Sequence, residues 1–154
     1  MKLCMIGTGY VGLVSGVCFA DLGNDVICVD KDISKINKLN KSIIPIYEPG
    51  LDELVKKNFK AGRLKFSNNL NESVAKSNII FICVGTPTKK NKYEADLTQV
   101  HTVANQISKL IKSYKIIVNK STVPVMTGDK VEKIISKKVK KKLFSVVSNP
   151  EFLR

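Results

Sequence analysis

Five short apolar runs in the sequence each lead into residues that can bind an anion or move a proton. The run at residues 2–6 is followed by Gly7-Thr8-Gly9-Tyr10-Val11-Gly12, and the run at residues 25–29 ends at Asp30. Three later runs lead into Gly85-Thr86-Pro87, Lys120-Ser121-Thr122-Val123-Pro124 and Ser148-Asn149-Pro150-Glu151. Such runs are typical of buried strands, and parallel strands end at one edge of a sheet. We therefore expect these groups to lie close together in the fold.

The first group has the spacing of a phosphate-binding turn. It reads G-x-G-x-x-G, follows an expected strand and opens a helical pattern. In this context Gly7 permits a tight turn, Gly9 lets the backbone approach a pyrophosphate, and Gly12 lets the helix pack closely on the strand. The N–H groups and the dipole at the start of the helix also favour phosphate. The alternative is a glycine turn that binds nothing.

Asp30 indicates which dinucleotide such a turn would bind. A carboxylate at the end of the second strand accepts hydrogen bonds from the adenosine ribose hydroxyls and repels a 2′-phosphate. The sequence therefore predicts NAD as the cofactor in preference to NADP, although the neighbouring Lys31 weakens this preference.

The later groups are less distinctive one by one. Gly, Pro, Ser and Thr are common in turns, and an acid such as Glu151 is commonly an exposed loop residue. Their position at the ends of neighbouring strands predicts instead that Glu151 orients water or a substrate hydroxyl. It also places five residues in the cofactor site, with the Thr hydroxyls on the phosphates or the nicotinamide ribose: Gly85, Thr86, Pro87, Ser121 and Thr122.

Six expected strands alternate with helices to position these residues. We expect strands at 2–6, 25–30, 64–66, 78–84, 115–119 and 143–147, and helices at 11–22, 35–41, 51–60, 69–76, 95–111 and 127–139. In the first helix, the core-facing residues are expected to be Val11, Val14, Cys18 and Leu22. This order predicts an α/β fold, a Rossmann-type doubly wound, mostly parallel six-stranded sheet with helices on both faces, within one domain of residues 1–154.

Composition argues against several other classes of protein. A net charge of +13 would suit nucleic acid, but only Arg63 and Arg154 are Arg, and no aromatic residues interleave with the Lys, so no nucleic-acid partner is expected. No apolar run is long enough to span a bilayer, so we expect no membrane partner and a cytoplasmic location. The four cysteines show no C-x-x-C spacing and lie in apolar segments, which predicts buried, reduced thiols and no metal site.

Seven segments together carry a family resemblance that no single motif carries. They are, in order, IGTGYVGLVSG, VDKD, PIYEPGL, FICVGTP, ADLTQV, KSTVPV with TGDKVE, and SNPEFLR. The chain resembles the N-terminal half of the nucleotide-sugar 6-dehydrogenases, and within them the members that act on UDP-glucose. The likeness covers essentially all 154 residues.

The resemblance implies NAD-dependent oxidation of UDP-glucose to UDP-glucuronate, in which the C6 alcohol passes through an aldehyde to a carboxylate. It adds Tyr10, Val11 and Lys35 to the cofactor-binding residues. It also implies that Thr122 helps to hold a catalytic water and that Glu151 lies between cofactor and substrate. A substrate-binding stretch would begin at Glu151 and continue through Phe152, Leu153 and Arg154.

The chain departs from the family pattern in two ways. Met126 stands where the family usually has Gly after STVPV, which puts the geometry of this loop in question. The family's Cys nucleophile, catalytic Lys, central helix and UDP-binding domain all lie beyond residue 154. We therefore expect a fragment that is inactive by itself and monomeric, from a full-length protein that forms a homodimer.

The sequence leaves other functions open. Within the family, the substrate of the whole protein could be GDP-mannose or UDP-N-acetylmannosamine, because these dehydrogenases share much of this half. Outside it, the chain could be a stand-alone dinucleotide-binding module without catalysis.

Overall fold

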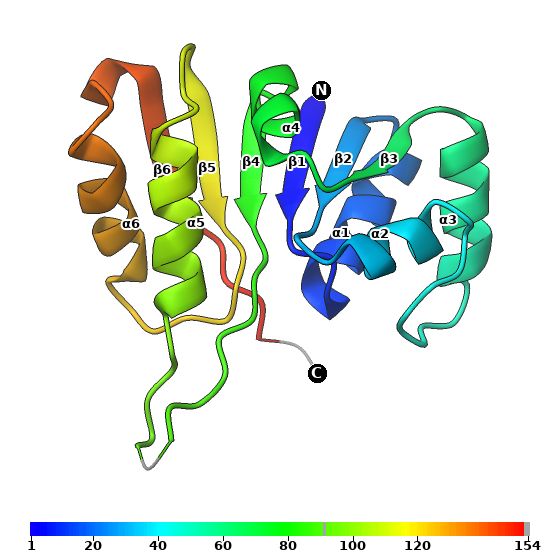
Figure 1. Cartoon of the computed structure of the whole chain (residues 1–154), viewed down its shortest axis with the longest axis horizontal. Helices are drawn as coiled ribbons and strands as arrows, with labels where there is room; N and C mark the ends of the chain where they lie inside the picture. Colours follow the sequence, from blue (N-terminus) through cyan, green and yellow to red (C-terminus); the bar gives the residue numbers. More distant parts are fainter. Residues whose placement is uncertain (91, 153–154) are drawn as a thin grey trace.

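Six parallel strands form one continuous sheet in the computed structural model, which describes residues 1–90 and 92–152. The strand order is β3-β2-β1-β4-β5-β6, so the chain reverses its direction of travel across the sheet between β1 and β4 (Figure 1). The strands are β1 (Lys2–Ile6), β2 (Asp25–Val29), β3 (Leu64–Ser67), β4 (Ile79–Ile82), β5 (Lys115–Asn119) and β6 (Phe144–Ser148). The predicted doubly wound, Rossmann-type sheet is confirmed.

Six α-helices in the described residues cover the two faces of the sheet. The helices α1 (Tyr10–Asp21), α2 (Ile33–Leu39) and α3 (Leu51–Lys60) contribute buried residues to one hydrophobic cluster. The helices α4 (Leu70–Lys76), α5 (Thr98–Ser108) and α6 (Thr127–Ser136) contribute to the other, and a short 3-10 helix, η1 (Lys141–Leu143), precedes β6. The strands supply both clusters alternately, with Cys4 and Ile6 on one face and Leu3 and Met5 on the other.

The buried face of α1 differs from the predicted one. Its buried residues are Gly12, Leu13, Gly16, Val17 and Ala20, whereas Cys18 and Leu22 are exposed. The helix is apolar on nearly every side, so periodicity does not select a face. The two glycines do, because a side chain at Gly16 would stand 2.7 Å from the Cys28 sulfur.

Three of the four cysteines are buried as predicted, and the prediction is wrong for Cys18, which is exposed on α1. Burial raises the pKa of Cys4 and of Cys83 to about 12 and raises that of Cys28 as well. These three thiols are therefore protonated and poorly nucleophilic at neutral pH.

Within residues 1–90 and 92–152, no helix combines the length and apolar character that crossing a membrane requires. In the same residues, no group of three or more His, Cys, Asp and Glu is arranged to hold a metal ion. His101 on α5 is half-buried.

Met126 has the backbone conformation that glycine favours. Its φ of 68° and ψ of 2° place it in the left-handed region, directly before α6. A non-glycine residue in this region costs on the order of 1–2 kcal/mol, and the side chain is exposed, so little packing offsets the strain. The loop therefore keeps a glycine-type geometry with a methionine in place.

Replacing Met126 with Gly is expected to raise the free energy of unfolding by about 0.5–1 kcal/mol. The relief of backbone strain exceeds the extra entropy that glycine gives to the unfolded chain. Urea unfolding of the two proteins measures the difference. Met126→Ala serves as the control, because it removes the side chain but keeps the Cβ, and equal stability of the two variants would contradict the strain argument.

Candidate functional site

A cavity of about 610 Å³ lies at the carboxyl edge of the sheet, where the strand order reverses between β1 and β4. Its walls include Gly7 and Gly9 of the glycine turn, Asp30 and Lys35 from the end of β2 and the start of α2, and Gly85 after β4. The structure therefore brings together three groups of predicted site residues that are far apart in the sequence.

Each of the three glycines of the turn is required for a different structural reason. Gly7 has a φ of +107°, and a Cβ there would lie 2.6 Å from the Cys83 carbonyl oxygen. A Cβ on Gly12 would lie 1.9 Å from the Gly7 carbonyl oxygen. A Cβ on Gly9 would meet no protein atom within 4 Å, so its absence leaves space on the cavity side. Gly7 and Gly12 are needed by the fold, whereas Gly9 is needed only by something that approaches the backbone closely.

The first turn of α1 offers hydrogen-bond donors to an anion. The first backbone bond of the helix runs from the Leu13 N–H to the Gly9 carbonyl at 2.9 Å, so the N–H groups of Tyr10, Val11 and Gly12 precede the hydrogen-bonded part of the helix. No side chain caps this end and no acid lies in the first turn. Free donors, helix dipole and the open space at Gly9 together fit the pyrophosphate of a dinucleotide.

The carboxylate of Asp30 faces the glycine turn. Its Oδ2 accepts hydrogen bonds from the Thr8 N–H at 2.9 Å and the Thr8 hydroxyl at 2.7 Å, and it pairs with Lys35 Nζ at 3.2 Å. Its Oδ1 accepts one bond, from the Asp32 N–H at 3.1 Å. Partial burial by itself would raise the pKa of Asp30, but the bonds from Thr8 and Asp32 and the charge of Lys35 outweigh it and lower the pKa to about 2. The group is therefore an oriented anion at neutral pH.

Asp30 is expected to make the stability of the chain fall as the pH drops from about 4 to about 2. Its folded pKa lies below the ordinary value of 3.8, so the ionised form stabilises the fold above that pH, and the contribution is lost as the pH falls through about 2. The shift corresponds to about 2 kcal/mol. Urea unfolding at several acid pH values measures it, with Asp30→Asn as the comparison. An equal acid-induced loss in both proteins would assign the effect to other groups.

The remaining predicted residues form a second cluster beside the cavity, where the loops after β4, β5 and β6 meet. The Thr86 hydroxyl donates to the Thr122 carbonyl at 2.6 Å, and the Thr122 hydroxyl donates to the Glu151 carbonyl. Ser121 is buried, and its hydroxyl donates to the Val84 carbonyl at 2.8 Å. Figure 1 shows the segment after β6 passing beneath the ends of β5 and β4. Val84 also lines the cavity, so Ser121 joins the two parts of the site.

Lys120 holds the Glu151 carboxylate, a contact that the sequence analysis missed. Lys120 Nζ lies 2.9 Å from Glu151 Oε2, and the side chains are 13% and 27% exposed. The Glu151 N–H also donates to the Lys120 carbonyl at 3.1 Å. The residue type and position of Lys120 were visible in the sequence, but a Lys in a basic chain gives no sign of its partner. Thr8, the other missed contact, lies within the glycine motif.

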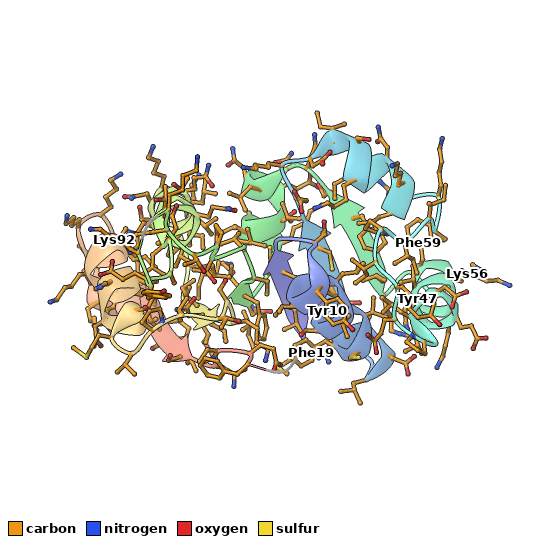
Figure 2. The ribbon with its side chains drawn as sticks, turned by 90° about the horizontal axis from the view of Figure 1, so that it is seen from below. Tyr10, Phe19, Tyr47, Lys56, Phe59 and Lys92 are labelled. Carbon is orange, nitrogen blue, oxygen red and sulfur yellow. The ribbon has the colours of Figure 1, made fainter. Side chains whose placement is uncertain are left out.

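Tyr10 contacts the loop before α3. Its hydroxyl donates to the Glu48 carboxylate, and Figure 2, seen from below the strand ends, places Tyr10 over α1 and Tyr47 beside α3. Val11 is half-buried against the α1 side of the core. Pro87 is exposed, and its carbonyl accepts a bond from the Asp96 N–H at 2.7 Å.

The predicted substrate-binding stretch is described only in part. Phe152 is 68% exposed, which leaves its side chain available to a ligand or another segment. Leu153 and Arg154 lie outside the described residues.

Four polar cavity residues come from α5 and were not predicted. Thr98, Gln99, Thr102 and Gln106 all line the cavity. In the sequence they form the polar face of an amphipathic helix, which is ordinarily a solvated face, so no signal in the sequence distinguished them.

Comparison with known proteins identifies the family of the chain. The family model described as the NAD binding domain of the UDP-glucose/GDP-mannose dehydrogenase family matches residues 1–154. A UDP-glucose 6-dehydrogenase of Rhizobium meliloti (strain 1021) is 54% identical over the whole chain, and UDP-glucose 6-dehydrogenase TuaD of Bacillus subtilis (strain 168) is 55% identical over 99% of it. The chain spans only 35% and 33% of these two proteins, about a third of their length.

Solved structures show the same fold at high similarity. A GDP-mannose dehydrogenase from Pseudomonas aeruginosa superposes with a TM-score of 0.94 at 38% identity, covering 100% of this chain and 37% of that one. A UDP-glucose dehydrogenase from the archaeon Pyrobaculum islandicum superposes with a TM-score of 0.92 at 38% identity, covering 99% and 36%. The chain therefore belongs to the UDP-glucose/GDP-mannose dehydrogenase family and is its NAD-binding domain.

Proposed function

We propose that this chain is the NAD-binding part of an enzyme that oxidises the C6 alcohol of UDP-glucose to a carboxylate. The observation that carries the proposal is the junction of two sites at one sheet edge: a dinucleotide cradle around Gly9 and Asp30, and the cluster of Thr122, Lys120 and Glu151 beside it. The high identity to UDP-glucose 6-dehydrogenases supports the choice of sugar.

Within this proposal, the residues of the cradle bind and orient the cofactor. The N–H groups at the start of α1 hold the pyrophosphate, and Asp30 accepts hydrogen bonds from the adenosine ribose, mainly at Oδ1, because Oδ2 already has three donors. Lys35 limits the net charge around this carboxylate. NAD, when bound, supplies the hydride acceptor.

The residues of the second cluster act on the substrate side. Glu151 is held after the end of β6 by its ion pair with Lys120 and by the hydrogen bond from its own N–H to the Lys120 carbonyl. In this position its carboxylate can orient a water or a substrate hydroxyl. The Thr122 hydroxyl donates a hydrogen bond to the Glu151 carbonyl, so Thr122 helps to position the backbone of Glu151. This role is additional to any water that Thr122 holds. We propose the same substrate side for Phe152, Leu153 and Arg154.

Titration of the chain with NADH, followed by its fluorescence, tests the cofactor part of the proposal. We expect saturable binding, and weaker binding of NADPH because of Asp30. Absence of binding at millimolar NADH, by a chain shown to be folded by circular dichroism, would overturn it.

A chimera tests the activity. Residues 1–154 replace the matching segment of B. subtilis TuaD, and NADH formation is followed with UDP-glucose, GDP-mannose and UDP-N-acetylmannosamine. We expect turnover of UDP-glucose, and loss of it when Glu151 is changed to Gln. Unmodified TuaD made in parallel is the control for the assay. A folded chimera that binds NADH without any turnover would remove the catalytic assignment of Glu151 and Thr122.

GDP-mannose is the second candidate substrate, because the structure of a GDP-mannose dehydrogenase superposes on this chain with a TM-score of 0.94. Its 38% identity is lower than the 54% and 55% of the UDP-glucose 6-dehydrogenases, which is why UDP-glucose is preferred. Comparing the turnover of UDP-glucose and of GDP-mannose by the chimera shows which of the two sugars this part of the chain favours.

The proposal also covers the setting of the chain. We propose that residues 1–154 are one NAD-binding unit, that the nucleophile and the UDP-binding residues come from sequence outside it, and that the whole enzyme is a cytoplasmic homodimer. A stand-alone nucleotide-binding module is the alternative, and sequencing the gene downstream of codon 154 separates the two.

A further inference from the structure

One wall of the cofactor cavity is a polar stripe on α5. Thr98, Thr102 and Gln106 are spaced by four residues, so they lie on one side of the helix, and all three line the cavity. At a rise of 1.5 Å per residue the stripe is about 12 Å long, comparable with the adenosine half of a dinucleotide. A face that would be solvated in an isolated helix is therefore part of the site.

The two ends of this stripe lie beside different parts of the cavity. Near its start, the Gln99 Nε2 lies 3.8 Å from where a Cβ of Gly85 would stand, which is beside the loop after β4. Near its end, Gln106 lines the cavity together with Asn68 and Leu70, and the same three residues line an adjoining hollow. Asn68 follows β3, the strand on the far side of β2 from the glycine turn. Gln106 and Asn68 therefore mark the end of the cavity that adjoins this hollow.

The geometry of the cradle decides which part of the cofactor reaches that end. In the proposed binding of NAD, the pyrophosphate would lie at the glycine turn after β1, and the adenosine ribose would lie at Asp30 after β2. The base is attached to this ribose and would continue in the same direction across the sheet, toward the end of β3. Leu70, Val29 and Val103 supply apolar surface there for the faces of a purine. The edge of the purine would then meet the amides of Gln106 and Asn68.

These amides have unused hydrogen-bonding capacity. Among the residues that the structure describes, no hydrogen bond joins the side chain of Gln106 or Asn68 to another protein group, and both residues are exposed. A carboxamide carries a donor and an acceptor side by side, which matches the N6 amine and N7 of adenine. A 6-oxopurine presents two acceptors along the same edge, so one carboxamide cannot pair with both atoms in the same way.

We propose that the side-chain amides of Gln106 and Asn68 recognise the N6/N7 edge of adenine and make this domain selective for adenine over a 6-oxopurine. This inference rests on the proposed binding of NAD in the cradle and adds a specificity that the glycine turn and Asp30 do not provide, because neither of them contacts the base.

The test compares binding of NAD and of its hypoxanthine analogue, in which oxygen replaces the N6 amine, to the 154-residue chain by isothermal titration calorimetry. We expect the wild-type chain to bind NAD about tenfold more tightly than the analogue. Gln106→Met keeps the length of the side chain but removes the amide, and Asn68→Leu does the same at the second position. Each is expected to bring the ratio of the two dissociation constants closer to one.

Gln99→Met is the matched control, because it removes the same amide from the same helix at the opposite end of the stripe. It should leave the ratio unchanged even if it alters both affinities. Equal binding of the two nucleotides by the wild-type chain, or the same change of ratio in Gln99→Met as in Gln106→Met, overturns the inference and leaves NAD binding intact. A folded wild-type chain that binds neither nucleotide overturns both the inference and the proposed function.

Discussion

Replacing Gly9 with Ala is expected to remove most of the affinity for NAD while the chain remains folded. A Cβ at this position would meet no protein atom within 4 Å, so the methyl group does not disturb the fold. It would project from the N-cap residue of α1 into the space that a pyrophosphate needs in order to reach the helix N–H groups. We expect the dissociation constant to rise on the order of 100-fold, about 3 kcal/mol, from lost hydrogen bonds to a charged group.

The stability of Gly9→Ala provides the internal check on this explanation. Gly9 is the N-cap of α1, and alanine is a poorer N-cap than glycine, so a loss of at most about 1 kcal/mol is expected. Gly12→Ala should behave in the opposite way. Its Cβ would lie 1.9 Å from the Gly7 carbonyl oxygen, which forces the helix away from the turn and destabilises the fold severely.

Urea unfolding and NADH titration of both variants separate the two effects. Gly128→Ala is the matched control, because a Cβ there makes only an ordinary contact at 3.7 Å with Ser148. It should change neither quantity appreciably. If Gly9→Ala binds NADH as tightly as the wild-type chain, the pyrophosphate does not lie at this turn.

Replacing Asp30 with Asn is expected to change the preference between the two dinucleotides by roughly 100-fold, about 3 kcal/mol. In the proposed binding of NAD, the wild-type carboxylate accepts hydrogen bonds from ribose and repels a 2′-phosphate, which carries about two negative charges. In the variant the repulsion disappears, and Lys35 loses its 3.2 Å partner while Lys31 remains at the cavity wall. Affinity for NADH should fall about tenfold, and affinity for NADPH should rise by a similar factor.

Asp32→Asn tests whether this effect is local. Asp32 lies two residues away and caps α2 through Lys35 N–H at 3.0 Å, but it does not line the cavity. It removes the same formal charge, so a general electrostatic effect would appear equally in both variants. We expect the ratio of NADH to NADPH affinity to change only in Asp30→Asn. Equal changes in the two variants would show that net charge, not contact with the ribose, sets the preference. Measurements at two salt concentrations add a second check, because a long-range effect is screened.

The sequence by itself determined the order and the type of the elements. Residues 51–60 were predicted as a helix and form α3, and residues 115–119 were predicted as a strand and form β5. The helix predicted to begin at Asn69 is also present, and the Asn69 side chain caps it by accepting a hydrogen bond from the Glu72 N–H at 3.1 Å. These features depend on neighbours within a few residues, so local periodicity and turn chemistry are sufficient to predict them. The glycine turn belongs with them, because its spacing encodes both its backbone and its place before α1.

Only the tertiary structure decided which faces and which partners those elements have. The buried side of α1 follows from close packing at Gly16 against β2, which periodicity in an almost wholly apolar helix cannot show. The pair of Lys120 and Glu151 and the polar wall of α5 join segments that lie far apart in the chain. Their contacts arise from the crossovers that bring the strand ends to one edge. The role of a polar residue can therefore be recognised only when its neighbours in space are known.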